Sequence, residues 1–271
     1  MTSLSVEVAP VTGGSWYRPP VGVTWQWQLY VDDEHPLNTT YDVTIYNIDL
    51  FNTGEATINA LQDAGHRVVC YFSAGSWEDY RHDRDQFASE ELGNTLDGWP
   101  AERWLDIRSP NVHRIMTERL DLAAAKGCDA VEPDNVQGYL ENTGFALGAE
   151  DQLAYNRFIA NEARTRGLGV ALKNDLEQVD SLVDYFDFSV NEQCFQYNEC
   201  HHLLPFIRAG KPVLNAEYPE QDDDLSPDDR PLTALCRAAN NLKFSTLVLP
   251  VALDDSFRAS CQIPSPRGKS R

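Results

Sequence analysis

Two carboxylates, Asp134 and Glu192, each stand at the end of a predicted buried strand. These strands are the fourth and the sixth of the chain, so in a closed barrel they are second neighbours and the two side chains converge across its mouth. Two carboxyl groups that flank a glycosidic bond can hydrolyse it. One donates a proton to the leaving oxygen, and the other acts as nucleophile or base. The sequence does not give the distance between them.

Polar, acidic and aromatic residues end seven consecutive predicted strands. In a parallel barrel the carboxyl ends of the strands form one face, which is where chemistry occurs. Aromatic rings stack on sugar rings, whereas carboxylates and amides bind hydroxyl or amino groups. We therefore expect substrate-binding subsites formed by Trp27, Gln28, Asp49, Tyr71, Ser73, Trp77, Glu132, Asn135, Lys173, Asn174, Asp175, Asn191, Glu217 and Tyr218.

Several of these residues also have a purely structural interpretation. Asp49 and Asp175 are each suited to cap a helix N-terminus. Glu132 lies within its strand, where a buried carboxylate needs a partner, and Lys173 at the end of the next strand can be that partner. The tryptophans Trp25 and Trp27 can pack the barrel floor instead of the cleft.

None of the six histidines ends a predicted strand, so a Ser-His-Asp triad or a histidine metal site lacks its central member. The chain also has no GxSxG turn, no GxGxxG turn and no phosphate-binding loop. We expect neither a metal nor a cofactor.

Strand-like and helix-like segments alternate along the chain, which is typical of a parallel α/β sheet. Helical spacing predicts helices over Glu55–Ala64, Pro110–Lys126 and Asp151–Arg166, each followed by a glycine. Eight strands in 271 residues fit a single-domain (β/α)8 TIM-type barrel over 21–262, with an N-terminal extension (1–20) and a disordered tail (263–271). The strands are expected at Val23–Tyr30, Val43–Ile48, Arg67–Phe72, Asp129–Pro133, Gly169–Lys173, Phe186–Asn191, Pro212–Ala216 and Ser245–Val251.

The 42 acidic and 22 basic residues give a formal net charge of −20. This charge speaks against nucleic acid or an anionic membrane as partner, and no run of about 18 apolar residues is present to span a membrane. It suits a cationic partner, although acidity can also serve solubility alone. We expect a monomer.

The six cysteines lack the close pairs of a zinc site. Cys194 and Cys200 flank a short aromatic loop and are the favoured disulfide; Cys236 with Cys261 and Cys70 with Cys128 are the remaining pairs. Three disulfides indicate an oxidising compartment and hence secretion, whereas six buried thiols would suit a cytosolic enzyme. The first residues show no basic segment followed by an apolar core, so a secreted form has already lost its export signal.

Several long segments resemble glycoside hydrolase family 114, which contains the endo-α-1,4-polygalactosaminidases. They are CYFSAGSWE (70–78), WLDIRSP (104–110), GCDAVEPDNVQGY (127–139), LKND (172–175), NEQC (191–194) and AGKPVLNAEY (209–218). The resemblance implies a barrel, export from the cell, and endo-hydrolysis of α-1,4-linked galactosamine polymers. It also implies that Asp134 and Glu192 carry the catalysis, and related retaining barrels suggest Asp134 as nucleophile and Glu192 as acid/base.

A polymer of free galactosamine is a polycation, which an acidic protein attracts. We expect Asp49, Glu132, Asp175 and Glu217 to line subsites for its ammonium or hydroxyl groups. The alternatives are a hydrolase of another α-linked polysaccharide, a non-catalytic carbohydrate-binding barrel, and, less well supported, a metal-dependent deacetylase.

Overall fold

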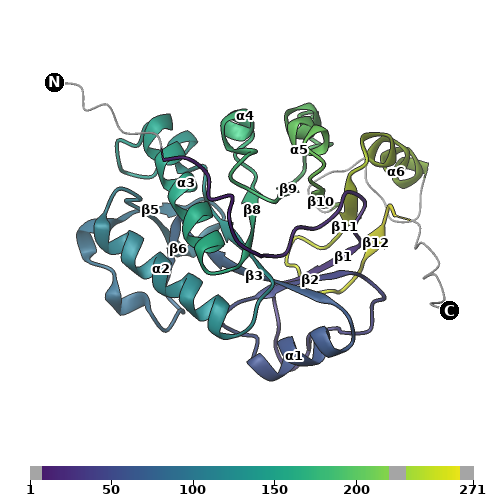
Figure 1. Cartoon of the computed structure of the whole chain (residues 1–271), viewed down its shortest axis with the longest axis horizontal. Helices are drawn as coiled ribbons and strands as arrows, with labels where there is room; N and C mark the ends of the chain where they lie inside the picture. Colours follow the sequence, from purple (N-terminus) through teal and green to yellow (C-terminus); the bar gives the residue numbers. More distant parts are fainter. Residues whose placement is uncertain (1–7, 220–229, 263–271) are drawn as a thin grey trace.

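The computed structural model describes residues 8–219 and 230–262. They form one α/β domain in which a curled, mostly parallel sheet carries helices on its outer side (Figure 1). The predicted disordered tail, 263–271, lies outside the described residues.

Eight parallel strands follow one another around the sheet, as predicted. Their bounds are β1 (Trp25–Gln28), β2 (Ile45–Asp49), β3 (Arg67–Ser73), β7 (Ala130–Asp134), β8 (Gly169–Lys173), β9 (Phe188–Glu192), β10 (Val213–Glu217) and β11 (Ser245–Val248). A ninth strand, β12 (Ala259–Ser260), pairs antiparallel with β11. The predicted barrel class is confirmed, with strand bounds that differ from the expected ones by a few residues.

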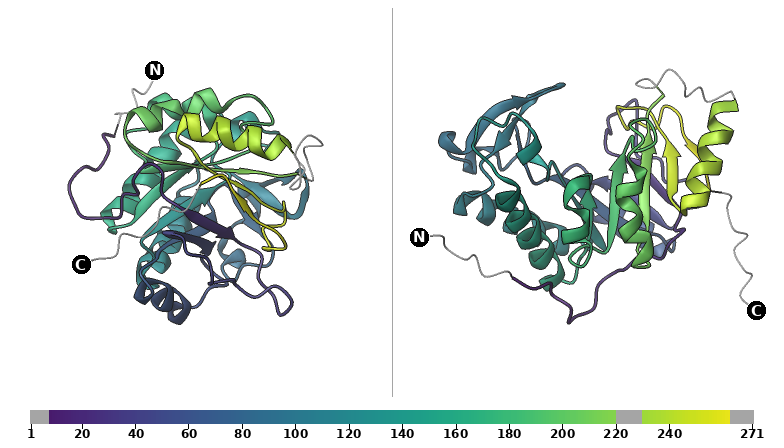
Figure 2. Two further views of the ribbon diagram at one scale, coloured as in Figure 1. Left: turned by 90° about the vertical axis from the view of Figure 1, so that its right-hand side faces the viewer. Right: turned by 90° about the horizontal axis from the view of Figure 1, so that it is seen from above.

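The first and the last parallel strand meet, which curls the sheet into a barrel. The Trp25 indole Nε1 donates to the Ser245 carbonyl oxygen at 2.8 Å, and the Ser245 hydroxyl donates to the Val23 carbonyl oxygen at 2.7 Å. Just after β1, the backbone amides of Leu29 and Tyr30 both donate to the Leu253 carbonyl oxygen, which follows β11. In the right-hand view of Figure 2, the two longest helices (110–125 and 149–165) lie on the left of the molecule, and the last parallel strand lies on the right.

The three predicted helices are present as α1 (Glu55–Asp63), α2 (Pro110–Ala125) and α3 (Ala149–Thr165). Each is followed by a glycine with positive φ, at Gly65, Gly127 and Gly167, as the sequence indicated. Three further helices follow later strands: α4 (Val179–Leu182), α5 (Leu204–Arg208) and α6 (Arg230–Leu242). Within the described segments, no helix has both the length and the apolar character needed to cross a membrane.

An antiparallel sheet between β3 and α2 was not predicted. It consists of β4 (Ser76–Glu78), β5 (Leu92–Leu96) and β6 (Trp99–Leu105) in the order β4-β6-β5, with two 3₁₀ turns, η1 (Arg84–Gln86) and η2 (Ser89–Glu91), between β4 and β5. Gly75 starts this insertion against the backbone that follows β7: a Cβ there would come within 1.7 Å of the Asn135 carbonyl oxygen. The insertion is therefore held directly on the end of β7.

All three expected disulfides are present, Cys70–Cys128, Cys194–Cys200 and Cys236–Cys261. The first joins Cys70 of β3 to Cys128, which lies between α2 and β7, across a sequence separation of 58 residues. The second closes a loop after β9 with a separation of only 6 residues.

We predict that the Cys70→Ala/Cys128→Ala variant loses more stability than Cys194→Ala/Cys200→Ala. On chain entropy alone, closing the longer loop contributes about 4 kcal/mol and closing the shorter one about 2 kcal/mol. Urea unfolding of both variants and of the wild-type protein measures this difference. Equal losses would contradict the prediction.

Candidate active site

Inward-facing residues at the carboxyl ends of three adjacent strands form a charged cluster. Glu132 and Asp134 come from β7, Lys173 from β8 and Glu192 from β9. Side chains alternate across a strand, so these residues share a face with the apolar residues that fill the barrel below, among them Ala130 of β7.

Lys173 lies at the centre of this cluster. Its Nζ is 3.1 Å from Glu132 Oε1, 3.1 Å from Asp134 Oδ1 and 3.3 Å from Glu192 Oε2. Burial disfavours the charged ammonium, but the three carboxylates outweigh it and hold the pKa of Lys173 well above its usual value. One fixed cation thus orients all three acids.

Glu132 differs from the other two acids because its side chain has no solvent exposure. Burial raises its pKa to about 7, against the opposing effect of Lys173, and Asn47 donates a hydrogen bond to its other oxygen. Asp134 and Glu192 keep 17% and 27% of their side-chain surface exposed. Of the three, only these two can therefore meet a substrate, and Glu132 has the structural partner that the sequence suggested.

Two tyrosines complete the contacts of the exposed pair. The Tyr71 hydroxyl donates to Asp134 Oδ2 at 3.0 Å, and the Tyr218 hydroxyl donates to Glu192 Oε1 at 2.5 Å. Burial, together with the nearby carboxylates, raises the pKa of both phenols well above 10. Both tyrosines hence stay protonated and act as fixed hydrogen-bond donors.

Asp134 and Glu192 are also close to each other. Since both contact the same Nζ, their nearest oxygens cannot be farther apart than the two contacts of 3.1 and 3.3 Å placed end to end. That upper limit includes the roughly 5–5.5 Å separation of the carboxyl groups in retaining glycosidases.

Trp27 forms part of the floor below the pair. It is 1% exposed and stacks on Trp25, and Lys173 Nζ lies 4.8 Å from the centroid of its ring. This position agrees with the structural interpretation of the two tryptophans, because a buried ring cannot stack on a sugar.

Gln28, Asn191 and Glu217 lie on the alternate, outward face of their strands. Gln28 binds the backbone of the loop after β1, and Glu217 accepts the backbone amide of Phe195 at 3.0 Å. Asn191 donates to Asn174 Oδ1, which also accepts the Glu192 amide. The structure does not bring the side chains of these three residues to the pair.

Asp49 and Asp175 are buried, and neither caps a helix through its side chain. Asp49 forms a two-point ion pair with Arg81 of the insertion, with distances of 3.0 and 2.7 Å. Asp175 accepts a hydrogen bond from Asn156 of α3 at 2.8 Å, and burial raises its pKa to about 7. Both tie the barrel to neighbouring elements.

Ser73 and Asn135 connect β3 and β7 beside Asp134. Ser73 pairs with Asp134 in the strand register, and the Asn135 amide donates to the Ser73 hydroxyl at 2.9 Å. Trp77 of β4 instead donates its indole to the Arg84 carbonyl oxygen within the insertion. Of the predicted site residues, Tyr71, Lys173, Asn174 and Tyr218 are the ones in direct contact with Asp134 or Glu192.

The insertion adds residues that the sequence reasoning missed, namely Ser76, Tyr80 and Glu102. The Ser76 hydroxyl contacts Ser73 Oγ at 2.6 Å and donates to Glu102 Oε2 at 2.6 Å. They were missed because the segment 76–105 was not assigned to any element. The Asp97-Gly98 pair between β5 and β6 is a hairpin signal that identifies it.

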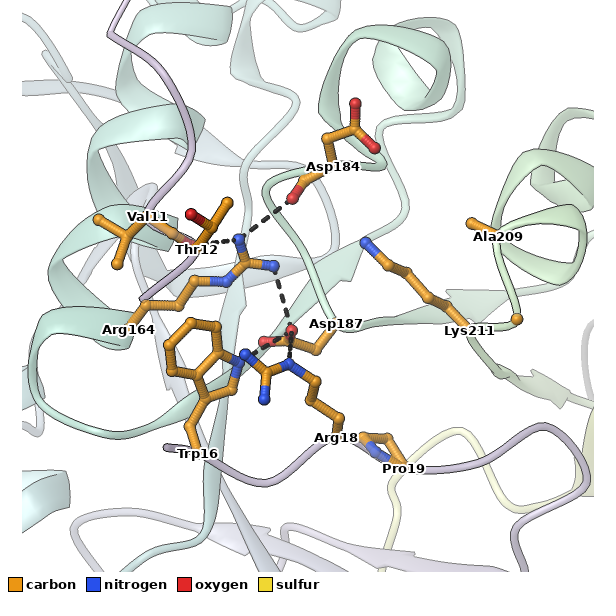
Figure 3. A pocket seen from close by; sticks show the side chains of 11 residues that line it. Val11, Thr12, Trp16, Arg18, Pro19, Arg164, Asp184, Asp187, Ala209 and Lys211 are labelled. Carbon is orange, nitrogen blue, oxygen red and sulfur yellow. Dashed lines mark hydrogen bonds and ion pairs between the residues drawn. The ribbon is translucent and has the colours of Figure 1, made fainter. Parts of the chain in front are cut away.

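A cavity of about 310 Å³ lies at the opposite, amino-terminal end of the strands. Figure 3 shows Asp187 at its centre, where it accepts hydrogen bonds from Trp16 and Arg164. These contacts fasten the N-terminal segment to α3 and β9, which is a structural role. Among the residues that the structure describes, no group of three or more histidine, cysteine or acidic side chains is placed to hold a metal.

A carboxylate pair at the carboxyl end of a parallel barrel is the arrangement expected of a barrel enzyme of the glycosidase type. Comparison with known proteins agrees: the model of glycoside-hydrolase family GH114 matches residues 6–265. The chain belongs to glycoside-hydrolase family GH114. The family and the enzyme class predicted from the sequence are thereby confirmed.

Solved structures of similar fold include Ega3 of Aspergillus fumigatus, crystallised in complex with galactosamine. It is 42% identical to this chain, with 92% of this chain and 99% of that chain covered and a TM-score of 0.85. The glycoside hydrolase domain of PelA from Pseudomonas aeruginosa is 15% identical, with 88% and 98% covered and a TM-score of 0.66, a similarity of fold alone. A search of curated protein sequences found no match.

We predict that Glu132→Gln gains stability relative to the wild-type protein as the pH rises. The pKa of Glu132 is raised from 4.5 to about 7 in the folded state, so between these values the folded wild type binds more protons than the unfolded chain. Its stability consequently falls across this window, whereas the variant has no such loss.

The expected gain is about 1–3 kcal/mol between roughly pH 5 and 8, measured by urea unfolding at several pH values. Glu118→Gln, at an exposed position on α2, serves as the control and should show no such trend. A stability difference that does not vary with pH would contradict the role given to Glu132.

Proposed function

We propose that this protein is an endo-acting hydrolase of α-1,4-linked galactosamine polymers that works with retention of configuration. The observation that carries the proposal is the placement of Asp134 and Glu192 on one shared ammonium, that of Lys173. Membership in family GH114 supplies the reaction class, and the 42% identity to Ega3, crystallised with galactosamine, supports the sugar.

In the first half of the reaction, Asp134 is the nucleophile. Its carboxylate attacks the anomeric carbon while the bond from that carbon to the glycosidic oxygen breaks. Glu192, protonated, gives its proton to that oxygen, so the leaving chain departs with a free hydroxyl. The product on the protein is an ester between the sugar and Asp134.

In the second half, the Glu192 carboxylate takes a proton from water and the resulting hydroxide attacks the same carbon. The bond to Asp134 breaks, and both carboxyl groups return to their starting states. Lys173 and Tyr71 hold the Asp134 oxygens for attack, and Tyr218 and Asn174 hold those of Glu192. Because these donors are already in place, little reorganisation is needed in the transition state.

The shared contact of the two carboxyl groups with Lys173 is compatible with retention. Retaining glycosidases hold the pair about 5–5.5 Å apart, since the nucleophile must reach the sugar directly and no water lies between. The common contact with Lys173 limits the separation here to a range that suits this geometry.

Charge supports a polycationic substrate. The protein carries a formal net charge of −20, and an acidic protein speeds the capture of a cationic chain, an effect that salt weakens. We further propose that the enzyme is exported, in keeping with its three disulfides, and acts as a monomer without metal or cofactor.

We expect wild-type protein to release short oligosaccharides from partially deacetylated α-1,4-galactosaminan. Asp134→Asn and Glu192→Gln should each lower the rate by at least about a hundredfold, since each removes one half of the acid and nucleophile pair. Mass spectrometry of the products gives the rates. Glu118→Gln on α2 removes the same charge far from the pair and is expected to keep full activity.

If wild type binds the polymer without cutting it, a non-catalytic carbohydrate-binding barrel replaces the proposal. If both Asp134→Asn and Glu192→Gln stay active, the catalytic pair is wrongly assigned.

Retention has its own test. We expect proton NMR during the first minutes of cleavage to show the α-anomer at the newly formed reducing end, before it equilibrates with the β-anomer. The expectation follows from two successive displacements at one carbon. Initial appearance of the β-anomer would establish inversion and contradict the nucleophilic role of Asp134.

A further inference from the structure

Glu102 of β6 is a buried acid beside the catalytic pair that has no cation of its own. It is 7% exposed, and among residues 8–219 and 230–262 no lysine, arginine or histidine lies within ion-pair distance of it. Its hydrogen-bond partners are hydroxyls: Ser76 donates to Oε2 at 2.6 Å, and Tyr80 donates to Oε1 at 3.4 Å. Burying an ionised carboxylate without a cation is unfavourable, and a cation bound beside Glu102 would offset that cost.

Its partner across the strand pair shows the contrast. Glu78 of β4 lies opposite Glu102 in the register and is also buried, at 1% exposed against 7%, and it has two guanidinium groups beside it. Arg81 lies 2.7 Å from Glu78 Oε1, and Arg119 lies 3.6 Å from Oε2. The fold thus neutralises one acid of the pair internally and leaves the other with neutral donors.

Glu102 is also connected to the catalytic strand. A chain of short contacts runs from Glu102 through Ser76 and Ser73 to Asn135, the residue after Asp134. Burial raises the pKa of Glu102 to about 7. The negative charges of Glu78 and Asp134 add to this rise, against the opposing effects of the Ser76 hydrogen bond and the Arg81 charge. The carboxyl groups of Glu102 and Asp134 are therefore within electrostatic reach of each other.

The approach to Glu102 lies at the molecular surface. Tyr80, whose hydroxyl contacts both Glu78 and Glu102, has 56% of its surface exposed. β3 ends at Ser73 and β4 begins at Ser76, and the hydroxyls of these two residues are 2.6 Å apart, so this end of β4 borders the carboxyl end of the barrel. A ligand at the catalytic pair can extend towards Tyr80 and Glu102.

We propose that Glu102 is a specificity-determining residue that binds the ammonium group of a galactosamine unit in the cleft, with Tyr80 beside it. This inference rests on the proposed function. A sugar hydroxyl would only add another neutral donor to those of Ser76 and Tyr80, whereas an ammonium supplies the missing charge. An N-acetylated unit has no such charge and gains nothing from Glu102.

The test compares α-1,4-galactosamine oligomers with the same oligomers after N-acetylation. In Glu102→Gln, which keeps an acceptor for Ser76, we expect KM for the free amine to rise about ten- to hundredfold, the range for a lost charged hydrogen bond. We expect kcat to stay within about threefold and the N-acetylated oligomer to be cleaved as by wild type, since no charged contact is lost with it. Glu90→Gln, an exposed acid of the same insertion, is the control for net charge and should leave both substrates unchanged.

A Glu102→Gln variant that weakens both substrates equally would show that Glu102 is only structural, and one that weakens neither would also overturn the proposal. If Glu102→Gln does not fold, as judged by circular dichroism, Glu102→Asp and Tyr80→Phe take its place. Each of these variants should raise KM for the free amine and leave KM for the N-acetylated oligomer unchanged. The rise should be smaller than that expected for Glu102→Gln, because the charge of Glu102 or Glu102 itself is retained.

A separate readout distinguishes failure of this inference from failure of the proposed function. If wild type cleaves neither oligomer, the proposed function fails, and thermal stabilisation by galactosamine still tests Glu102. Loss of that stabilisation in Glu102→Gln supports the ammonium contact. Equal stabilisation of both proteins, or none of the wild type, overturns it.

Discussion

The active end of the barrel depends on a single buried cation. Lys173 brings together acids from β7 and β9 that would otherwise repel each other, and it does so with 2% of its side chain exposed. The register between β7 and β8 pairs Ala130 with Gly169 and Val131 with Val170 at the start of the two strands. The Lys173 ammonium lies among the acids at the opposite ends of the strands. Removal of this cation would leave up to three carboxylates without a counter-charge. The loss of stability would then exceed the net stabilisation that the ion pairs contribute, because the remaining buried charges are unpaired.

A second ionic network fastens the insertion to the barrel. Arg119 of α2 binds Asp83 through two nitrogens and also donates to the Ser73 carbonyl oxygen at the end of β3. Arg81 binds Asp49 at the end of β2. These contacts are nearly as buried as those of Lys173, so the insertion cannot move without exposing paired charges. The rigidity of the insertion makes its residues suitable for binding a substrate.

The sequence predicted the eight parallel strands because each is a short, buried run whose period and length are unambiguous. It also predicted that Asp134 and Glu192 converge at the end of the barrel, and that Lys173 is a partner for Glu132; their catalytic roles stay a prediction. It was less informative about which face each strand-end residue occupies. Gln28, Asn191 and Glu217 were grouped with the cleft because they end strands, although the alternation of side chains puts them one position out of phase with Trp27, Glu192 and Tyr218. The insertion escaped prediction because its antiparallel strands lack the continuous buried runs of the barrel strands. Its role also depends on contacts between residues far apart in the sequence, such as Glu102 with Ser76.

Backbone conformation explains why amides follow the strand ends. Asn135, Asn174 and Gln193 come directly after Asp134, Lys173 and Glu192, and all three have positive φ, of 60°, 47° and 62°. Side chains other than glycine pay about 1–2 kcal/mol for this left-handed conformation, and asparagine tolerates it best. It turns the chain sharply after the functional residue, so that the strand ends with its charged side chain in the cluster. Strain of this kind gathers at functional sites. Here the left-handed conformation recurs at the ends of the three strands that Lys173 joins. Asn135 and Asn174 therefore suit their positions through backbone conformation alone, independently of any contact with substrate.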